Sequence, residues 1–339
     1  MDRVDGAIGN TLSERAVSLL RCPTCRGAMT RADSRLTCSS CSMSFEVARG
    51  VPFLLDETRS SFRLPGVPSP QAQAMARRSW ISIGKRWGPT IEFNLTGRES
   101  MRRFKARLLA EAPRPVVLNV GGKHAGSFSA LVATDPAVDC IELHVALAPR
   151  TNLVADPHAL PLADASVDAV IIDAVLEHMI DPVRVAEEIF RVLRKGGLVY
   201  ADSPFMVPVH GGTHDFLRFS SVAHRRLFRH FSHVESGISG GPGSALALSI
   251  QGFMLSFARS ARGRAAAKVL CRLGFFWLKY FDHLLKNRPG SWDAALGTYF
   301  VGQKQERPTA DRDLIQQYPG TSPRWMSQFD GDPVTGRAP

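Results

Sequence analysis

The chain has 339 residues, of which 44% are hydrophobic and 22% are charged. This composition excludes a disordered chain and provides enough apolar side chains for a sizeable core. The formal net charge of +11 predicts an anionic partner such as a nucleic acid, a phosphorylated metabolite or a membrane surface. The alternative is a solvated basic face, because the basic residues form no run of five or six.

The N-terminal residues lack the apolar segment of a secretory signal, and no apolar stretch reaches the ~18–20 residues that span a bilayer. We therefore expect a cytoplasmic protein. In a reducing compartment, six cysteines do not predict a disulfide framework.

Four of the cysteines form two C-x-x-C pairs, CPTC and CSSC, with 12 residues between the pairs. Each pair can direct two thiolates to one point, and a short hairpin between the pairs would bring the two points together. Four soft thiolates suit a closed tetrahedral Zn²⁺ site, which contributes folding free energy to a small segment. The sequence therefore predicts structural Zn²⁺ on Cys22, Cys25, Cys38 and Cys41. A redox pair or free thiols would not account for two pairs.

The surrounding segment, LLRCPTCRGAM…LTCSSCSMSFEVARGVPFLL, resembles the Trm112-like zinc ribbon that precedes many bacterial methyltransferases. The resemblance covers residues 19–56 and implies a structural or partner-binding element. We expect this ribbon to occupy residues 15–58. Residues 59–113 are predicted to be a Pro/Ser-rich linker followed by a helical stretch near 72–110, which APRP ends.

From Val116 onward, strand-like runs alternate with helical patterns: VVLNV, VDCIELHVAL, TNLVAD, VDAVIID and GLVYADSPF. This alternation predicts an α/β fold with a doubly wound, mostly parallel sheet. In such a sheet the ligand lies outside the carboxyl ends of the strands.

One helix can be predicted residue by residue. Asp181 suits the N-cap position and Pro182 the first helical position. We expect this helix to include Arg194 and Lys195 in its last turn, and to stop at the glycine pair at 196–197.

Residues 154–203 resemble class I S-adenosylmethionine-dependent methyltransferases of the type 11 group, through AD-x-x-x-LP, S-x-DAV, VLEH, the DP-started helix and RVLRKGG. The resemblance extends over 114–304. It implies a Rossmann-like domain, S-adenosylmethionine as cofactor, and an antiparallel last strand at GTYFVGQK with HVESG as its partner.

The resemblance also implies a set of cofactor-binding residues. They are Asn119, Gly121, Gly122, Lys123, His144, Asp156 and Ala159. Asp156 matches the acid that holds the adenine amino group, and Ala159 would line the ring. The alternative is that Asp156 only caps its own turn.

Three of these positions depart from the family pattern. Asn119 stands in place of an acid, Lys123 in place of a glycine, and His144 in place of the acid that receives the ribose hydroxyls. A neutral imidazole offers one acceptor and one donor, whereas a carboxylate accepts two hydrogen bonds. The site is therefore either a modified cofactor site or a degenerate, non-catalytic one.

The loop DSPFMVPVHGGTHDFLRFSS follows the fifth strand and gathers four chemically active side chains. A His–Asp pair can remove a proton and an arginine can hold an anion, so His210, His214 and Asp215 are candidate catalytic residues and Arg218 a candidate substrate residue. The alternative is a folded-back loop in which His and Asp satisfy backbone groups.

Residues 244–286 combine apolar and basic side chains, which predicts helices inserted before the last strand. They would form a lid over the substrate pocket or a basic amphipathic surface for a membrane or a lipid-linked substrate. Residues 305–339 are polar and rich in Pro and Gly, and are predicted to be a mobile tail.

These patterns predict a methyltransferase that acts on an oxygen or nitrogen of a small molecule or of a glycan or lipid precursor. An RNA methyltransferase is the alternative enzyme, supported if the bases of the ribbon and of residues 77–107 form one face. A non-catalytic binding protein with the same fold is the other alternative.

Overall fold

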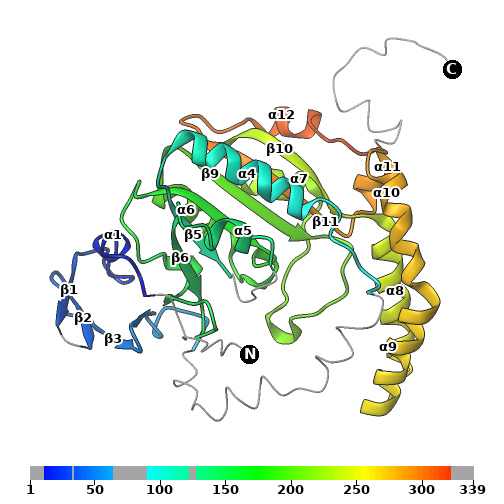
Figure 1. Cartoon of the computed structure of the whole chain (residues 1–339), viewed down its shortest axis with the longest axis horizontal. Coiled ribbons are helices and arrows are strands. Elements are labelled where there is room, and N and C mark those ends of the chain that lie inside the picture. Colours follow the sequence, from blue (N-terminus) through cyan, green and yellow to red (C-terminus); the bar gives the residue numbers. More distant parts are fainter. Residues whose placement is uncertain (1–10, 33, 64–89, 122–126, 322–339) are drawn as a thin grey trace, which may run out of the picture.

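The computed structural model describes residues 11–32, 34–63, 90–121 and 127–321. Its elements are labelled as in Figure 1. The strands are β1 (Met29–Ala32), β2 (Arg35–Cys38), β3 (Ser44–Ala48), β4 (Val51–Leu54), β5 (Val116–Val120), β6 (Asp139–His144), β7 (Leu153–Ala155), β8 (Val167–Asp173), β9 (Leu193–Pro204), β10 (Phe231–Gly240) and β11 (Gly297–Lys304).

The helices connect or flank these strands. The α-helices are α1 (Glu14–Ser18), α4 (Gly97–Glu111), α5 (Ala130–Ala133), α6 (Pro182–Val192), α7 (Ser221–Leu227), α8 (Pro242–Ser256), α9 (Ala261–Phe275), α10 (Phe281–Leu285), α11 (Gly290–Asp293) and α12 (Asp311–Gln316). The 3₁₀ helices are η1 (Pro157–Ala159), η2 (Leu176–His178), η3 (Gly212–His214) and η4 (Phe276–Tyr280).

The described strands form one sheet in the order β1-β2-β3-β4-β7-β6-β5-β8-β9-β11-β10. Neighbours from β7 to β9 pair in parallel, and β11 is antiparallel to both β9 and β10. Counted from β5, the order is 3-2-1-4-5-7-6, which differs from the common Rossmann order 3-2-1-4-5-6 by the inserted antiparallel strand. The predicted Rossmann-like α/β architecture, including GTYFVGQK as the antiparallel strand, is therefore confirmed.

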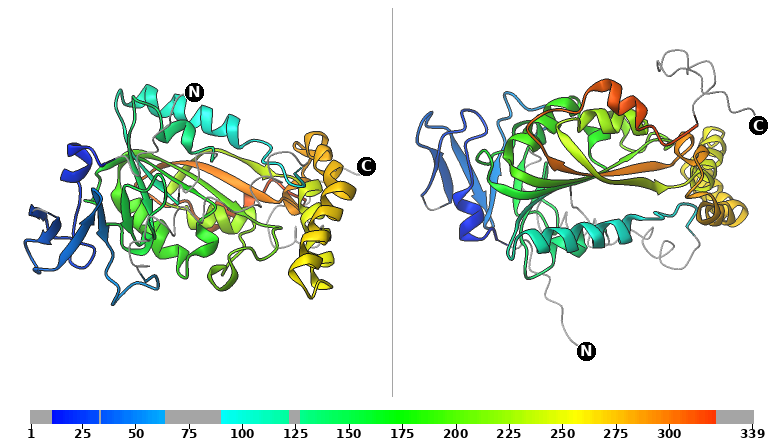
Figure 2. Two further views of the ribbon diagram at one scale, coloured as in Figure 1. Left: turned by 60° about the horizontal axis from the view of Figure 1, so that its bottom comes forward. Right: turned by 90° about the horizontal axis from the view of Figure 1, so that it is seen from above.

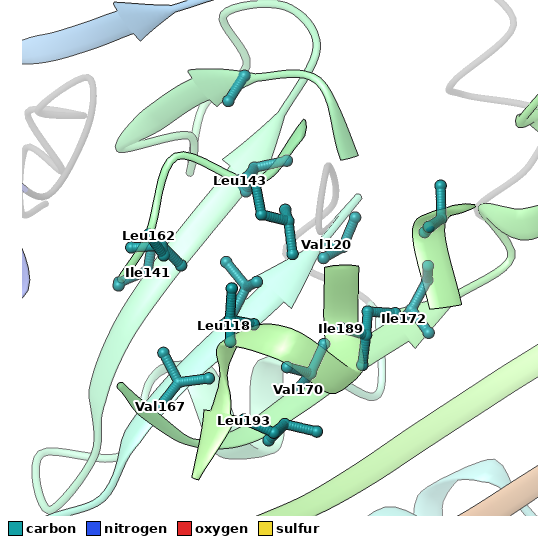
Figure 3. Packing of buried hydrophobic residues seen from close by; sticks show 14 of the residues in the cluster. Leu118, Val120, Ile141, Leu143, Leu162, Val167, Val170, Ile172, Ile189 and Leu193 are labelled. Atoms are coloured by element: carbon teal, nitrogen blue, oxygen red, sulfur yellow. The ribbon is translucent and has the colours of Figure 1, made fainter. Parts of the chain in front are cut away.

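Helices cover both faces of the sheet (Figure 2). On one face, Leu118 of β5 and Val170 of β8 belong to the same apolar cluster as Ile189 of α6 (Figure 3). On the other face, Val117 of β5 clusters with Phe104 of α4. Successive β5 side chains thus point to opposite apolar layers, which explains why VVLNV is an almost continuous apolar run.

Helix α6 begins as predicted, with the Asp181 carboxylate accepting from the backbone N–H of Arg184. It ends at Val192, earlier than predicted. Arg194 and Lys195 belong to β9, because Leu193 already pairs with Val167 of β8 and the Arg194 guanidinium contacts the Asp168 carboxylate. Pairing with the sheet therefore overrides the helical pattern.

The N-terminal segment is joined to the main sheet. The hairpin β1–β2 is followed by β3 and β4, and β4 pairs in parallel with β7, with Phe53 opposite Val154. A bridge between Leu20 and Leu162 adds a second connection. The cysteine-bearing segment therefore lies at one end of a continuous sheet (Figure 1).

Helices α8 to α10 come between β10 and β11 in the chain. In space they lie at the opposite end of the sheet from β1–β3 (Figure 1). Among the described residues, no helix is both long and apolar enough to cross a membrane.

Two predicted segments need correction. The helical stretch expected near 72–110 begins at Gly97, and its part from 72 to 89 lies outside the described residues. The mobile tail expected from 305 is wrong over 305–321, because α12 contacts α7 there and Leu314 is 2% exposed. Residues 322–339 lie outside the described residues.

Candidate functional site

The four cysteines of the two C-x-x-C pairs form one cluster. Cys22 Sγ lies 3.7 Å from Cys41 Sγ, and Cys25 Sγ lies 3.4 Å from Cys38 Sγ. The four sulfurs all lie within 4.8 Å of one another. Zn–S bonds of ~2.3 Å in a tetrahedron separate the sulfurs by about 3.8 Å, so this cluster can hold a zinc ion with little rearrangement. The β1–β2 hairpin brings the pairs together.

A first cavity of about 590 Å³ opens at the carboxyl ends of β5, β6 and β8. Val120, Leu143 and Val175 give it an apolar wall, and Asp173 and His144 add polar groups. Its volume lies within the range of small-molecule sites. We call it the cofactor cavity, because it lies where a doubly wound sheet binds its nucleotide.

Gly121 ends the strand VVLNV in this cavity with a φ of +85°. A Cβ at this position would lie 2.2 Å from Cγ2 of Val175. Both the backbone conformation and the close approach therefore require glycine. Gly122 and Lys123 lie outside the described residues.

His144 lines the cofactor cavity from the end of β6, and its Nδ1 lies 2.9 Å from the backbone nitrogen of Ala146. Asn119 does not line the cavity: it is 1% exposed and donates from Nδ2 to the Glu142 carboxylate at 2.8 Å. Glu142 also pairs with Arg150, yet burial raises the pKa of this carboxyl. The predicted role of Asn119 as a cofactor residue needs correction, because its amide donates to Ser129 and Glu142 and the residue does not line the cavity.

Asp156 caps its own turn. Its Oδ1 accepts from the backbone nitrogen and Nδ1 of His158 at 2.9 and 2.7 Å, and its Oδ2 accepts from the Ser60 hydroxyl at 2.5 Å. Burial would raise the pKa of Asp156, but these hydrogen bonds hold it below its usual range. Asp156 and Ala159 are not among the residues that line the cavity, whereas Pro157 is. The predicted adenine contact of Asp156 stays a prediction.

A second cavity of about 790 Å³ adjoins the first, and the two share Asp173 and Ala174. Helices α8 and α9 form one wall of it, with Leu248, Arg264 and Lys268. This arrangement fits the expected lid, and we call this space the substrate cavity.

Three carboxyl groups line the sheet side of the substrate cavity. Burial raises the pKa of Glu177 to about 7 and that of Asp173 to about 6. Burial and the charge of Asp173 raise the pKa of Asp202 well above its usual range. Among the described residues, neither carboxylate oxygen of Glu177 has a hydrogen-bond partner.

The four residues predicted in the loop after β9 lie in different environments. His210 lines the substrate cavity and His214 lines the cofactor cavity. Arg218 binds the Asp215 carboxylate through two nitrogens and donates to the carbonyls of Val207 and Pro208. Hydrogen bonds from Arg218 hold the pKa of Asp215 far below its usual range.

The structure therefore corrects two of these predictions. The Asp215 carboxylate also accepts from the backbone N–H groups of His210 and Gly211, so Asp215 and Arg218 fix the loop, as in the folded-back alternative. Arg218 does not line either cavity and is not placed to hold a substrate. His210 stays within reach of Asp215, with Nδ1 3.4 Å from Oδ2.

Several site residues were missed by the sequence-based prediction. Glu177 and His178 lie in the VLEH motif but were not assigned a role, and Asp173 ends the strand VDAVIID. Their positions just after a buried strand were the available signal. No motif in the sequence indicated Phe62, because only the tertiary structure brings this residue to the cofactor cavity.

Comparison with known proteins agrees with this geometry. The methyltransferase domain family matches residues 121–201, which run from Gly121 to the middle of β9. An uncharacterized methyltransferase of Mycolicibacterium gilvum (strain PYR-GCK) is 34% identical over 170 residues, covering 44% of this chain and 63% of that relative. The chain thus spans less than two thirds of this curated relative.

Solved structures with some likeness include the [4+2]-cyclase SpnF, at 18% identity and a TM-score of 0.40, covering 72% of this chain and 100% of that chain. Another is the 1,6-didemethyltoxoflavin-N1-methyltransferase of Burkholderia thailandensis, at 14% identity and a TM-score of 0.37, covering 71% of this chain and 92% of that chain. The fold of this region is described by the strand order of its sheet.

Proposed function

We propose that this protein is an S-adenosylmethionine-dependent methyltransferase that acts on an oxygen or nitrogen of a small-molecule, glycan or lipid precursor. The observation that carries the proposal is the pair of cavities that meet at Asp173 and Ala174, at the carboxyl ends of β5 and β8. One cavity lies in the segment that matches the methyltransferase domain, and the other opens toward the inserted helices. Two adjoining spaces are what transfer between two bound molecules requires.

The residues of the cofactor cavity fit S-adenosylmethionine. Gly121 leaves the backbone open to close approach, His144 offers a polar ring at the ribose position, and Pro157 with Val145 provides an apolar slot for adenine. The cofactor supplies an electrophilic methyl group. The protein has to align a nucleophile with that methyl group and exclude water. This task does not require a catalytic base.

The substrate class is inferred from the inserted helices. Arg264 and Lys268 line the substrate cavity, and both are exposed, so they favour a substrate with an anionic group. The outer surface of these helices carries large exposed apolar side chains: Phe253, Phe257, Leu270, Leu273, Trp277 and Leu284. A basic surface with apolar side chains suits peripheral contact with an anionic membrane, and hence a lipid-linked precursor.

The cysteine cluster is proposed to hold structural Zn²⁺ in a Trm112-like ribbon, in a cytoplasmic protein. The sulfur distances support it. Because β4 pairs with β7 of the main sheet, we expect loss of the ion to destabilise the whole protein. Removing the metal with a chelator should lower the thermal midpoint of the whole protein, and re-addition of Zn²⁺ should restore it. An unchanged midpoint after complete metal loss would contradict a structural ion.

The RNA methyltransferase alternative loses its main support on the described part of residues 77–107. The bases of α4 are largely paired with acids: Arg103 with Glu235, Lys105 with Asp135, and Arg107 with Glu111. The structure therefore offers no continuous unpaired basic face along this helix. The non-catalytic alternative still rests on His144, which lines the cofactor cavity.

Calorimetry of the zinc-loaded protein with S-adenosylmethionine and S-adenosylhomocysteine tests the proposal. We expect binding of both at one equivalent. A folded sample that binds neither at millimolar concentration would favour the non-catalytic alternative. Sedimentation with vesicles that contain an anionic phospholipid tests the membrane contact. The Phe253→Ser, Phe257→Ser variant should sediment less than the wild type, with Phe93→Ser as the matched control.

A further inference from the structure

A compact cluster of three side chains lies between the two cavities and has no role in the function proposed above. Glu177 and His178 come from η2, and His210 comes from the loop after β9. Their ligand atoms all lie within 4.8 Å of one another. Nε2 of His178 is 3.7 Å and Nε2 of His210 is 3.6 Å from Oε1 of Glu177. We call this group the Glu–His–His cluster.

Glu177 is the buried centre of the cluster. The residue is 0% exposed, and neither of its carboxylate oxygens has a hydrogen-bond partner within the part of the chain that the structure describes. A buried carboxyl without such partners is either held neutral by a raised pKa or compensated by a cation, and a bound cation would make the ionised form of Glu177 the stable one. Its own backbone carbonyl accepts from the N–H groups of Phe216 and Leu217, so the loop that carries His210 is fixed against η2.

The other nitrogen of each imidazole has an oxygen nearby. Nδ1 of His178 lies 2.6 Å from the carbonyl oxygen of His214, and Nδ1 of His210 lies 3.4 Å from the carboxylate of Asp215. Arg218 Nη2 also lies 3.5 Å from Nδ1 of His210. A proton on Nδ1 of His178, shared with the His214 carbonyl, leaves a lone pair on Nε2, which is the usual arrangement of a metal-binding histidine. In His210 the same arrangement requires that Nδ1 donates to Asp215 and does not accept from Arg218.

We propose that Glu177, His178 and His210 bind a divalent transition-metal ion. Two imidazoles and one carboxylate are a donor set typical of Mn²⁺, Fe²⁺, Co²⁺ and Zn²⁺, and they leave coordination positions open. Glu177 and His210 line the substrate cavity, so these open positions face the substrate and would take water or a substrate oxygen. The carboxyl of Asp173 in the same wall, with a pKa of about 6, is mostly ionised at neutral pH and adds negative potential that attracts a cation.

Metal binding can be measured without cofactor or substrate, so its result does not depend on the methyltransferase proposal. The zinc-loaded protein is titrated with Mn²⁺, and free Mn²⁺ is followed by electron paramagnetic resonance. We expect one Mn²⁺ bound per chain in addition to the ribbon zinc. Co²⁺ should bind in the same place without the thiolate charge-transfer absorption that the cysteine cluster would give.

The variants Glu177→Gln and His210→Ala should each weaken Mn²⁺ binding at least tenfold. His210 lies in an exposed loop, so His210→Ala is expected to fold even if the buried Glu177→Gln does not. His233→Ala removes an exposed histidine of β10 outside the cluster and should bind Mn²⁺ as the wild type does. A zinc-loaded wild type that leaves Mn²⁺ and Co²⁺ free, or a His210→Ala variant with wild-type affinity, would overturn the proposal.

Discussion

The hydroxyl of Ser60 donates a hydrogen bond to the carboxylate of Asp156, although 96 positions of sequence separate them. Ser60 lies just after the cysteine-bearing segment, and Asp156 lies in the turn after β7. Phe62, two residues after Ser60, lines the cofactor cavity. Its ring stacks on that of His214, with ring centroids 6.3 Å apart and an interplanar angle of 18°. The N-terminal segment is therefore a structural part of the cofactor cavity.

Replacing Ser60 tests whether this contact stabilises the fold. Ser60→Ala removes the donor to a carboxylate that is 6% exposed, so the free energy of unfolding should fall by about 1–3 kcal/mol. Chemical denaturation at neutral pH measures the change. The neighbouring exposed Ser61→Ala is the matched control and should have little effect. Equal stability of the two variants would contradict a role for the Ser60–Asp156 bond.

Replacing Phe62 tests whether the N-terminal segment contributes to cofactor binding. Phe62→Ala removes an aromatic wall of the cofactor cavity, so the dissociation constant for S-adenosylhomocysteine should rise by about fivefold or more. Phe93 lines the substrate cavity instead, and Phe93→Ala should leave this constant unchanged. Calorimetry measures both. An unchanged constant for Phe62→Ala would show that the cofactor does not reach this wall.

His144 stands where a carboxylate would accept both ribose hydroxyls. His144→Asp should tighten S-adenosylhomocysteine binding by about one to two decades, because a charged bidentate acceptor replaces a single one. The aspartate can still accept from the backbone N–H of residue 146, as short acidic side chains do in turns. His144→Asn keeps that acceptor without the charge, and should bind more weakly than His144→Asp. Weaker binding by His144→Asp than by the wild type would mean that the ribose lies elsewhere.

Gly121 should tolerate no side chain. Gly121→Ala places a Cβ against Val175 at a φ of +85°, so we expect a loss of about 1–3 kcal/mol in the free energy of unfolding and a weaker cofactor site. Gly274→Ala is the matched control, because nothing lies within 4 Å of a Cβ there and the position is helical. Thermal and chemical denaturation compare the two. A Gly121→Ala variant as stable as Gly274→Ala would contradict the close packing of Gly121 against Val175.

His224 should make stability depend on pH. It is 1% exposed beside Phe219 and Phe228, and burial lowers its pKa to about 4 from an ordinary value near 6.5. Between pH 6.5 and pH 4 the unfolded state therefore binds more protons than the folded state. The contribution of neutral His224 is fully present above pH 6.5 and is lost as pH falls, up to about 3 kcal/mol below pH 4.

The variant His224→Phe keeps a ring without the titration. Its free energy of unfolding should fall by about 2 kcal/mol less than that of the wild type between pH 7 and pH 5. His283→Phe, at an exposed position, should follow the wild type. Denaturant titrations at both pH values measure the slopes. Parallel slopes for the wild type and His224→Phe would contradict a buried neutral histidine.

Local chemistry made part of the structure predictable. Asp181 and Pro182 specify where α6 begins, because an N-cap acceptor and a fixed φ act within one turn. The C-x-x-C spacing specifies the cysteine cluster, since each pair needs only its own turn and the hairpin between them. The end of α6 was not predictable in the same way, because Leu193 pairs with Val167 of β8 and therefore begins a strand where the local pattern continues the helix.

The sequence by itself determined the order of strands and helices, the cysteine cluster and the position of the glycine turn after β5, because each depends on side chains close together in the chain. The tertiary structure decided which polar groups share a cavity. It turned Asn119 toward Glu142, engaged Asp156 with Ser60, and paired Arg218 with Asp215. It also brought His210 to Glu177 and His178. Apart from the Arg218–Asp215 pair, which forms within one loop, these contacts join segments far apart in the chain. They form once the parallel sheet aligns the carboxyl ends of its strands at one edge.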